Sequence, residues 1–579
     1  MWWIKDPDRL KREVSAVDAL RENEPWLSAA TPRLTEKLEL AFDFDLLVNG
    51  ETLPFTLRYP AFFPETPPLV IPRDGGQLSN HQYGNGGELC LEYRPDNWEL
   101  QITGARLIES AYRLLSTEMS PSEERAIVAS EHSVSLGQQL RGWAFRFLLT
   151  REIMKYIADL PIDACSGAII TDMLVPPKNF TAYIKTLGSS DDPDWQEITI
   201  PDRGDTGVQG VLIRIASLAD FPLSPEQATL DQLIASAREV DAAPTNTDTD
   251  RYRFTVVADA HSATMFYSYF KEGRWGVFPY RSVHLTDDAE QRLPETYHVL
   301  ANKKVGIVGC GALGSKIAAS LARSGIRAFV LVDDDIFKPG NLVRHDLDVG
   351  SLGAHKAEAL AARLKAITAG ITVSARRVLL GGQESSGGTA SVLDELSTCD
   401  LLIDATADPQ AFNFVASVAR NRLRPMVWAE VYAGGIGGFV ARLRPGIEPP
   451  PHSARRQYLA WCRDRGVPWH GLDQDYGAQG IAAETLIADD SNVAVIAGHA
   501  TRMAVDVLVH PDDTAFPHPA YVIGLAKQWI FSEPFDTRPI DFAPDGDWAP
   551  QMSPERTEEA ILFMSSLLES GKDEDRTGG

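Results

Sequence analysis

Cysteine is scarce in this sequence, and its few copies lie far apart. The chain has 579 residues and five cysteines, and no two of them are separated by only two residues. They are Cys90, Cys165, Cys310, Cys399 and Cys462. Disulfide-rich domains and the common structural zinc sites need cysteines at short, regular spacings. The sequence therefore excludes both, and it leaves open what five separate thiols do.

Basic residues are few relative to acidic ones. The chain has 55 Lys and Arg against 80 Asp and Glu, which gives a formal net charge of −25. A protein that grips nucleic acid or an anionic membrane surface needs clustered cations. We therefore expect no nucleic acid and no membrane among its partners. This balance does not exclude a local basic pocket for a nucleotide.

Long apolar runs are missing as well. No stretch of about 18 apolar residues occurs, which is the length that a membrane-spanning helix requires. Residues 1–6 become charged at once and do not form the apolar core of a signal peptide. We therefore expect a cytoplasmic protein whose thiols stay reduced.

The composition is that of a folded α/β multidomain chain. Hydrophobic residues make up 44% and charged residues 23%, which is typical of globular proteins. The pattern predicts four regions, which are an α+β domain at 1–150, a middle α/β linker domain at 151–285, a Rossmann-like domain at 286–545, and a C-terminal helix with a tail at 546–579.

Local patterns support this division. A charged helical stretch at 8–21 precedes strand-like segments at 38–48 and 51–59, and helical periodicity returns at 103–115 and 134–157. The middle region mixes short β-like runs with polar loops and contains no catalytic constellation. Its polar stretch Ala-Ala-Pro-Thr-Asn-Thr-Asp-Thr-Asp, at 242–250, predicts a surface loop or linker.

The third region alternates strands with helices, which implies right-handed crossovers and a mainly parallel sheet. The buried strand at 305–308 runs into a G-x-G-x-x-G loop formed by Gly309, Gly311 and Gly314. Asp333 ends the next strand, where a carboxylate meets ribose hydroxyls. The pattern alone fits NAD, FAD and ATP equally.

The residues that follow distinguish among these nucleotides. The segment 333–344 opens with three aspartates and contains Asn341 and Arg344; Lys356 precedes a helix, and Asp408 follows a buried strand. This assembly resembles the ThiF/MoeB family and the adenylation domains of ubiquitin-activating enzymes. A nicotinamide enzyme has no need of the Arg and Lys at these positions.

The resemblance implies ATP and Mg²⁺ as cofactors and a role for each residue. Gly309, Gly311 and Gly314 pack against the nucleotide, Asp333 binds ribose with Asp335 beside it, Asn341, Arg344 and Lys356 contact the triphosphate, and Asp408 holds Mg²⁺. Attack of a carboxylate on a phosphate brings two anions together, so cations and a metal must offset that charge. The family also implies a homodimer through this domain and an arginine from upstream, for which Arg281 and Arg292 are candidates.

Two departures from the family concern cysteine. Its two Cys-x-x-Cys zinc pairs are missing. Its thioester cysteine, when present, lies in a crossover loop, and the matching segment here contains Cys462. The flanking Arg463 and Arg465 favour a lowered thiol pKa and an acyl-carrier role. The competing interpretation is a buried core cysteine beside Trp461.

Cys90 is the best-placed thiol for acyl transfer. The motif Y-P-x-x-x-P-x-x-P-P-x-V at 59–70 precedes a Gly/Asn-rich loop, then Cys90, and then Trp98. This order resembles the ubiquitin-conjugating (E2-like, UBC) fold, which implies that Cys90 carries a thioester. His81, with Asn80 and Asn85, is a candidate for ordering the loop or polarising the thioester carbonyl. The usual His-Pro-Asn triplet is absent, since Gln82 follows His81.

The order of the regions resembles the E2–E1 fusion proteins of bacterial ubiquitin-like conjugation operons, such as those of CBASS antiphage defence. The resemblance implies ATP-dependent adenylation of a partner's C-terminal carboxylate, thioester transfer to Cys90, and conjugation to a target lysine. The expected partner is a ubiquitin-like protein or a CD-NTase-type nucleotidyltransferase. Two alternatives are a sulfur-carrier-activating adenylyltransferase and an NAD(P)- or FAD-dependent oxidoreductase.

Overall fold

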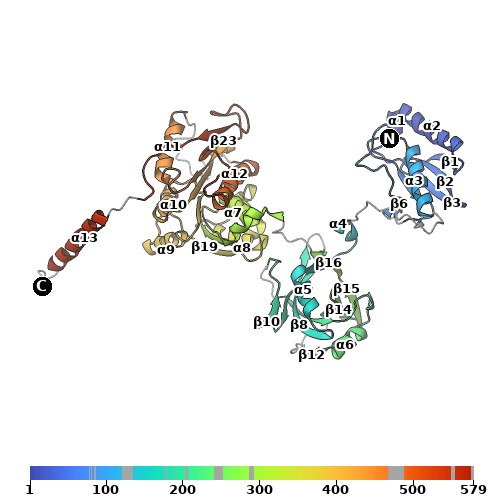
Figure 1. Ribbon diagram of the computed structural model, residues 1–579, viewed down its shortest axis with the longest axis horizontal. Helices are drawn as coiled ribbons and strands as arrows, with labels where there is room; N and C mark the ends of the chain where they lie inside the picture. Colours follow the sequence, from blue (N-terminus) through green and yellow to red (C-terminus); the bar gives the residue numbers. More distant parts are fainter. Residues whose placement is uncertain are drawn as a thin grey trace. The chain divides into compact units, whose positions relative to one another are not determined.

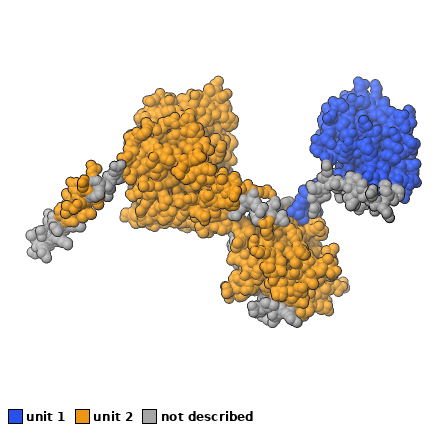
Figure 2. All heavy atoms as spheres, viewed as in Figure 1, with its two compact units in different colours: residues 1–142 blue, residues 143–579 orange. Residues whose placement is uncertain are grey.

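The computed structural model divides the chain into two compact units, residues 1–142 and 143–579 (Figure 2). It describes residues 1–76, 78–79, 81–83, 86–119, 135–175, 179–189, 191–201, 207–239, 252–285, 292–466, 488–549 and 554–574. The polar stretch at 242–250 and the candidate loop residues Asn80 and Asn85 lie outside these ranges.

The first unit contains an antiparallel sheet and three helices in its first 119 residues (Figure 1). Its strands run in the order β1-β2-β3-β4, with bounds Leu27–Leu34, Leu40–Val48, Glu51–Arg58 and Leu69–Pro72. The helices are α1 (Trp2–Lys5), α2 (Pro7–Asn23) and α3 (Gly104–Glu118). Asp6 starts α2, because its carboxylate accepts a hydrogen bond from the Arg9 N–H and Pro7 occupies the first turn. The predicted helix at 8–21 and strands at 38–48 and 51–59 are confirmed.

A buried carboxylate joins the helices of the first unit to its sheet. Glu13 on α2 is fully buried and lies 2.8 Å from the Arg9 guanidinium. The Tyr59 hydroxyl, just after β3, donates to Glu13 at 2.8 Å, and the Gly104 N–H at the start of α3 donates at 2.7 Å. Burial of a charge is tolerated when it is paired and hydrogen-bonded in this way.

The second unit begins with a ten-stranded mixed sheet. Its main path is β15-β14-β13-β11-β8-β9-β7-β16, and β10 and β12 pair with β9 and β8. The bounds are β7 Phe145–Thr150, β8 Ala164–Val175, β9 Asn179–Gly188, β10 Pro193–Gln196, β11 Val208–Arg214, β12 Arg238–Glu239, β13 Tyr252–Ala258, β14 Ala263–Lys271, β15 Arg274–Pro279 and β16 Arg281–Leu285. Helices α5 (Arg151–Asp159) and α6 (Gln227–Ser236) accompany it.

The helix predicted at 134–157 is wrong. Its described part, from residue 135, contains the short helix α4 (Leu136–Gln139), the strand β7 and the start of α5. Phe147 and Leu149 alternate with less buried neighbours and belong to the hydrophobic core of the sheet, while β7 pairs in parallel with both β9 and β16. Strand pairing with distant segments therefore outweighs local helical periodicity here.

The second unit also contains a sheet of eight strands, called the second sheet below, with the order β19-β18-β17-β20-β21-β22-β23-β24. Strands β19 to β21 of this order are parallel, and the remaining three pairings are antiparallel. The bounds are β17 Lys304–Val308, β18 Ala328–Val332, β19 Thr372–Arg376, β20 Leu401–Asp404, β21 Met426–Val431, β22 Gly437–Leu443, β23 Ala520–Gly524 and β24 Thr537–Ile540. The predicted Rossmann-like topology is confirmed.

Helices cover both faces of this sheet. On one face lie α7 (Ala312–Ser324), α8 (Lys356–Ile367) and α12 (Asp490–Val509); on the other lie α9 (Ser386–Leu396), α10 (Pro409–Arg422) and α11 (Pro451–Arg463) (Figure 1). Helix α12 is long and apolar enough to cross a membrane by length and composition alone, but 61% of its apolar window is buried, and it packs against α7, β21 and β22. It is therefore a core helix. The last described helix is α13 (Pro554–Glu574).

Substitution of Gly104 by alanine tests the Glu13 network. A Cβ at Gly104 would lie 2.1 Å from the Tyr59 hydroxyl oxygen, so this oxygen would have to leave Glu13. We expect Gly104→Ala to destabilise the first unit by about 1–3 kcal/mol, the usual cost of overpacking. Amide hydrogen exchange of β2 and β3 in the full chain measures it. Gly137→Ala is the control, since its nearest neighbour would be 3.9 Å away, and equal exchange in both variants would contradict the account.

Candidate active site

The candidate nucleotide site lies where the strand order of the second sheet reverses. Strand β17 has β18 on one side and β20 on the other, and all three are parallel. The loops after their carboxyl ends therefore meet at one edge of the sheet, which is where ligands bind in folds of this topology. The G-x-G-x-x-G loop follows β17, Asp333 follows β18, and Asp408 follows β20.

The three glycines of the loop differ in the space that a side chain would have at each position. Gly309 has φ +87°, a conformation that side chains rarely adopt, and a Cβ there would lie 2.9 Å from the Thr406 methyl carbon. A Cβ at Gly314 would lie 1.9 Å from the Gly309 carbonyl oxygen. A Cβ at Gly311 would meet nothing within 4 Å, so this position faces open space. Two glycines are needed for packing, and the third leaves room for a ligand.

The beginning of helix α7 fits an anionic group. Gly311 precedes its first residue, and no side chain caps the first turn. The first N–H groups of a helix lack partners within the helix and carry partial positive charge. Together with the open space at Gly311, this arrangement fits a phosphate.

Asp333 braces the glycine loop. One carboxylate oxygen accepts a hydrogen bond from the Cys310 N–H at 2.7 Å, and the other accepts one from the Asp335 N–H at 2.9 Å. Burial raises the pKa of Asp333, although Lys356 and these hydrogen bonds oppose the rise. Each oxygen keeps a further lone pair, so both can still accept a bond from a ribose hydroxyl.

The predicted phosphate-binding lysine is paired with a carboxylate of its own chain. The Lys356 ammonium lies 2.6 Å from the Asp335 carboxylate, and Lys338 lies 3.1 Å from the other oxygen. Burial opposes ionisation of Asp335, but the hydrogen bonds from both lysines outweigh it and lower its pKa. Contact of Lys356 with a triphosphate stays a prediction, and it requires the ammonium to share or leave Asp335.

Asn341 and Arg344 occupy a short 3-10 turn, Pro339–Val343, and its end. The Asn341 side-chain oxygen accepts a hydrogen bond from the Lys338 N–H at 2.8 Å, so it shapes the turn. Arg344 is half-buried, and its guanidinium forms no ion pair with any residue that the structure describes. Arg344 is therefore the cation at this edge of the sheet that can accept an anion without breaking an existing pair.

His345 supports the loop from behind, a role that the sequence did not indicate. Its Nδ1 accepts a hydrogen bond from the Leu347 N–H at 3.1 Å, so Nε2 carries the proton and donates to the Cys310 carbonyl at 2.8 Å. Burial lowers the pKa of His345 to about 4, and the bond to Cys310 opposes this only in part. The neutral imidazole is thus the form that holds the loop.

Asp408 caps helix α10 and keeps one carboxylate oxygen open. Its Oδ1 accepts hydrogen bonds from the Gln410 and Ala411 N–H groups at 2.6 and 3.1 Å, and the side chain is exposed. The described residues contain no cluster of three or more metal-ligating side chains. Mg²⁺ is commonly held by one or two carboxylates together with substrate phosphates, and a single exposed carboxylate fits that mode.

The two upstream arginines belong to segments other than the loops that form this edge of the sheet. The Arg281 guanidinium carbon lies 5.8 Å from the centre of the Trp143 ring. Arg281 begins β16 of the ten-stranded sheet, and Trp143 lies just before β7 of the same sheet. Arg292 is exposed just before the 3-10 helix Glu295–Asn302. Their roles stay predictions.

Cys90 follows a short hairpin, β5 (Gln82–Tyr83) and β6 (Glu88–Leu89). Its N–H donates to the His81 carbonyl at 2.7 Å, which extends the ladder by one pair. The thiol is half-buried, and this burial raises its pKa while Arg94 opposes the rise. A thiol that accepts an already activated acyl group needs access more than a low pKa, so this environment is compatible with transfer.

Gln82, which stands where the usual His-Pro-Asn triplet has proline, organises the loop before Cys90. Its side-chain oxygen accepts hydrogen bonds from the Leu78 and Ser79 N–H groups at 2.6 and 3.0 Å. Its side-chain nitrogen donates to the Gly76 and Gly87 carbonyls at 3.1 and 2.9 Å. One amide thus ties together both sides of the loop.

His81 lies against a carboxylate at the end of α3. It is 6% exposed, and its Nε2 lies 3.5 Å from the carboxylate of Glu118 at the end of α3. This contact favours a loop-ordering role for His81. Polarisation of a thioester carbonyl stays a prediction.

The flanking Arg465 lowers the pKa of Cys462, as expected, but burial outweighs it. The side chain is 2% exposed and belongs to the core cluster that contains Tyr458 and Trp428. Burial raises the pKa of the thiol to about 11, and Arg465 is the weakest of the opposing influences. The structure thus gives the features of a core cysteine, and a thioester on Cys462 stays a prediction.

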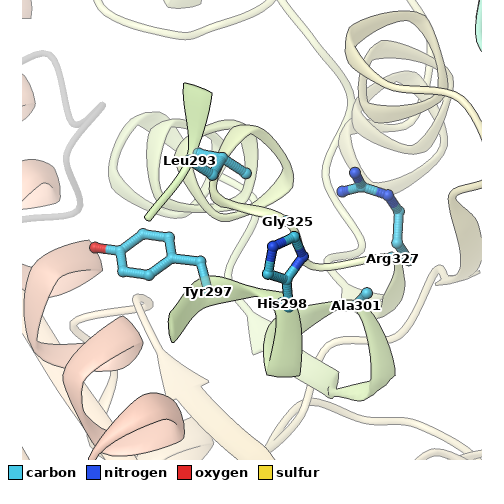
Figure 3. A pocket seen from close by; sticks show the side chains of 6 residues that line it. All are labelled: Leu293, Tyr297, His298, Ala301, Gly325 and Arg327. Carbon is cyan, nitrogen blue, oxygen red and sulfur yellow. The ribbon is translucent and has the colours of Figure 1, made fainter. Parts of the chain in front are cut away.

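A small hollow opens at the other end of helix α7 (Figure 3). Its lining residues are Leu293, Tyr297, His298, Ala301, Gly325 and Arg327. Helix α7 has 13 residues, so this hollow is about 20 Å from the glycine loop. It is therefore not part of the nucleotide site.

Comparisons with known proteins agree with the site. Residues 289–527 match the model of the ThiF family. Protein y4qC of Sinorhizobium fredii is 28% identical over 222 residues, which cover 37% of this chain and 38% of that protein. The ATP-dependent ubiquitin transferase-like protein Cap2 of Vibrio cholerae is 36% identical over 126 residues, 21% of this chain and 20% of Cap2. The chain thus spans well under half the length of these relatives.

Among solved structures, that of E. coli MccB with ATP is similar to part of this chain. It is 16% identical, with a TM-score of 0.33, and the match covers 45% of this chain and 68% of that one. Residues 289–527, which include the glycine loop, are thus similar to the ThiF family.

Acid titration tests the role of neutral His345. Its pKa is lowered in the folded protein, so protonation favours unfolding, and stability is lost as pH falls from about 6.5 towards about 4. His345→Gln can make the same two hydrogen bonds without titrating. As pH falls through that window, we expect its free energy of unfolding to decrease less than that of the wild type, by up to ~1.4 kcal/mol per pH unit. Denaturant unfolding followed by amide exchange of β17 and β18 measures it. Parallel pH profiles of the two proteins would contradict the assignment.

Proposed function

We propose that this protein activates the C-terminal carboxylate of a protein partner with ATP and passes it as a thioester to Cys90 for conjugation to an amine. The observation that carries the first step is the combination of an open glycine loop with Arg344 at the same sheet edge, whose guanidinium forms no ion pair among the described residues. Hydride transfer would need no such cation, so the oxidoreductase alternative explains only the glycine loop and Asp333.

The chain's own residues supply the environment of adenylation. A partner's carboxylate oxygen attacks the α-phosphorus of ATP, and the bond to the bridging oxygen breaks, which releases pyrophosphate. Arg344, and Lys356 once it shares or leaves Asp335, offset the negative charge that builds up as the two anions meet. When bound at Asp408, Mg²⁺ would neutralise phosphate charge.

Thioester formation follows from the chemistry of an acyl adenylate. A thiolate attacks the acyl carbon, and AMP leaves with the bonding electrons. Cys90 is the half-buried cysteine, whereas the other four, Cys165, Cys310, Cys399 and Cys462, are buried. We therefore favour direct transfer to Cys90 over a relay through Cys462. A target amine, for which a lysine is the expected source, then attacks the thioester and releases the thiol.

The partial matches to Cap2 proteins and to the SAMP-activating enzyme E1 of Haloferax volcanii support a conjugation role. Our proposed partner is a ubiquitin-like protein or a CD-NTase-type nucleotidyltransferase, and the proposed setting is cytoplasmic antiphage defence, with a homodimer formed through the adenylation domain. A sulfur-carrier-activating enzyme would share the first step but would have no use for an accessible Cys90.

Non-reducing electrophoresis with ATP, Mg²⁺ and a candidate ubiquitin-like protein tests the transfer. We expect a thiol-sensitive adduct with the wild-type chain and with Cys462→Ala, and at least a tenfold loss with Cys90→Ala, because only Cys90 offers an accessible thiol. Cys165→Ala is the matched control, since Cys165 is a buried cysteine outside both candidate sites.

Two outcomes would overturn parts of this proposal. An adduct that persists in Cys90→Ala would remove Cys90 from the reaction. An adduct on Cys90 that disappears in Cys462→Ala, but not in Cys165→Ala, would establish the relay and contradict direct transfer.

A further inference from the structure

Thr406 connects the loop after β20 to both halves of the nucleotide site. Its hydroxyl donates to Asp404 Oδ1 at 2.6 Å, and its own N–H donates to the same oxygen at 3.0 Å. The hydroxyl oxygen also accepts a hydrogen bond from the Asp408 N–H at 3.0 Å. A single side chain thus links a buried carboxylate at the strand end to the backbone of Asp408.

The methyl group of Thr406 makes the second connection. It lies 2.9 Å from the position that a Cβ would take at Gly309, so it packs directly against the glycine loop. Gly309 is fixed in turn by its N–H bond to the Val332 carbonyl at 2.9 Å. The two loops at the strand-order reversal therefore touch through Thr406.

Asp404 is the anchor of this connection. It is 1% exposed at the end of β20, and its Oδ2 is buried without a hydrogen-bond partner among the described residues. A buried carboxylate with one oxygen unsatisfied is costly, so its retention at a site of chemistry points to a local role. Between Asp404 and Asp408, Ala407 adopts φ +56°, a conformation that the hydrogen bonds on either side hold in place.

We propose that Thr406 is a positioning residue for nucleotide activation: its hydroxyl holds Asp408 where a metal–phosphate group binds. This inference rests on the proposed adenylation function for the ligand, but the hydrogen bonds that carry it exist without ligand. Asp408 itself would contact the metal, and Thr406 acts through it.

Two conservative substitutions separate the hydroxyl from the methyl. Thr406→Val keeps the shape of the side chain and removes the two hydrogen bonds of the hydroxyl, to Asp404 Oδ1 and from the Asp408 N–H. Thr406→Ser keeps those bonds and removes the methyl. We expect the valine variant to raise the Mg²⁺ concentration for half-maximal ATP binding about fivefold, the ratio that corresponds to one net hydrogen bond. We expect the serine variant to stay within twofold in Mg²⁺ requirement.

Amide hydrogen exchange of the full chain without nucleotide provides an independent readout. The peptide containing Asp408 should exchange at least fivefold faster in Thr406→Val than in wild type, while Thr406→Ser should match wild type there. Calorimetric binding of ATP at a series of Mg²⁺ concentrations then reports whether the loosened backbone matters for the ligand. A merely structural role would lower the melting temperature of the valine variant without changing its Mg²⁺ requirement relative to serine.

Each result decides the proposal. Faster exchange at Asp408 together with the raised Mg²⁺ requirement, both confined to the valine variant, supports it. Unchanged exchange, or an equal Mg²⁺ requirement in both variants, overturns it. Failure of the wild-type chain to bind ATP would contradict the proposed function and the ligand part of this inference, and the exchange result would still establish or refute the Thr406–Asp408 bond.

Discussion

The nucleotide site depends on the hydrogen bond between the Asp333 carboxylate and the Cys310 N–H. The carboxylate stands at the end of β18 and bonds the Cys310 N–H of the neighbouring loop, which fixes the distance between two strand ends. The Cys310 carbonyl is held by neutral His345, so the same peptide is restrained from both sides. Because the loop is restrained by the protein and the space beside Gly311 is open, the loop needs little reorganisation when a phosphate binds.

Burial separates the five thiols that the sequence left unassigned. Cys310 and Cys399 are fully buried in the two cores on either side of the second sheet, and burial raises the pKa of Cys399 to about 12. Cys462 lies in the same core as Cys399. Cys90 alone combines partial exposure with a loop ordered by one amide, that of Gln82. The arrangement favours one acyl-carrying thiol in the chain over a relay of two.

Sequence patterns predicted the parts of this protein that depend on near neighbours. The glycine loop, Asp333 and the parallel strands follow from local spacing, and the structure places them as expected. Thr406 was not found, although its hydroxyl bonds residues two positions away on either side, because spacing alone does not show which side chains pair. His345 was not found because its role arises from a contact across the fold, with a carbonyl 35 positions away. The helix predicted at 134–157 failed for the same reason, since β7 is specified by pairing with β9 and β16. The raised pKa of Cys462 likewise reflects burial that its flanking arginines do not reveal.

We propose that the eight-stranded sheet binds ATP and not a nicotinamide or flavin cofactor. Equilibrium calorimetry of the full chain with ATP–Mg²⁺, NAD⁺ and FAD tests it most directly, with Arg344→Met as the variant. We expect ATP to bind at least a hundredfold more tightly than NAD⁺ or FAD. We expect Arg344→Met to weaken ATP binding at least tenfold, because it removes the guanidinium that forms no ion pair among the described residues. NAD⁺ or FAD binding as tightly as ATP, or ATP binding unaffected by Arg344→Met, would contradict it.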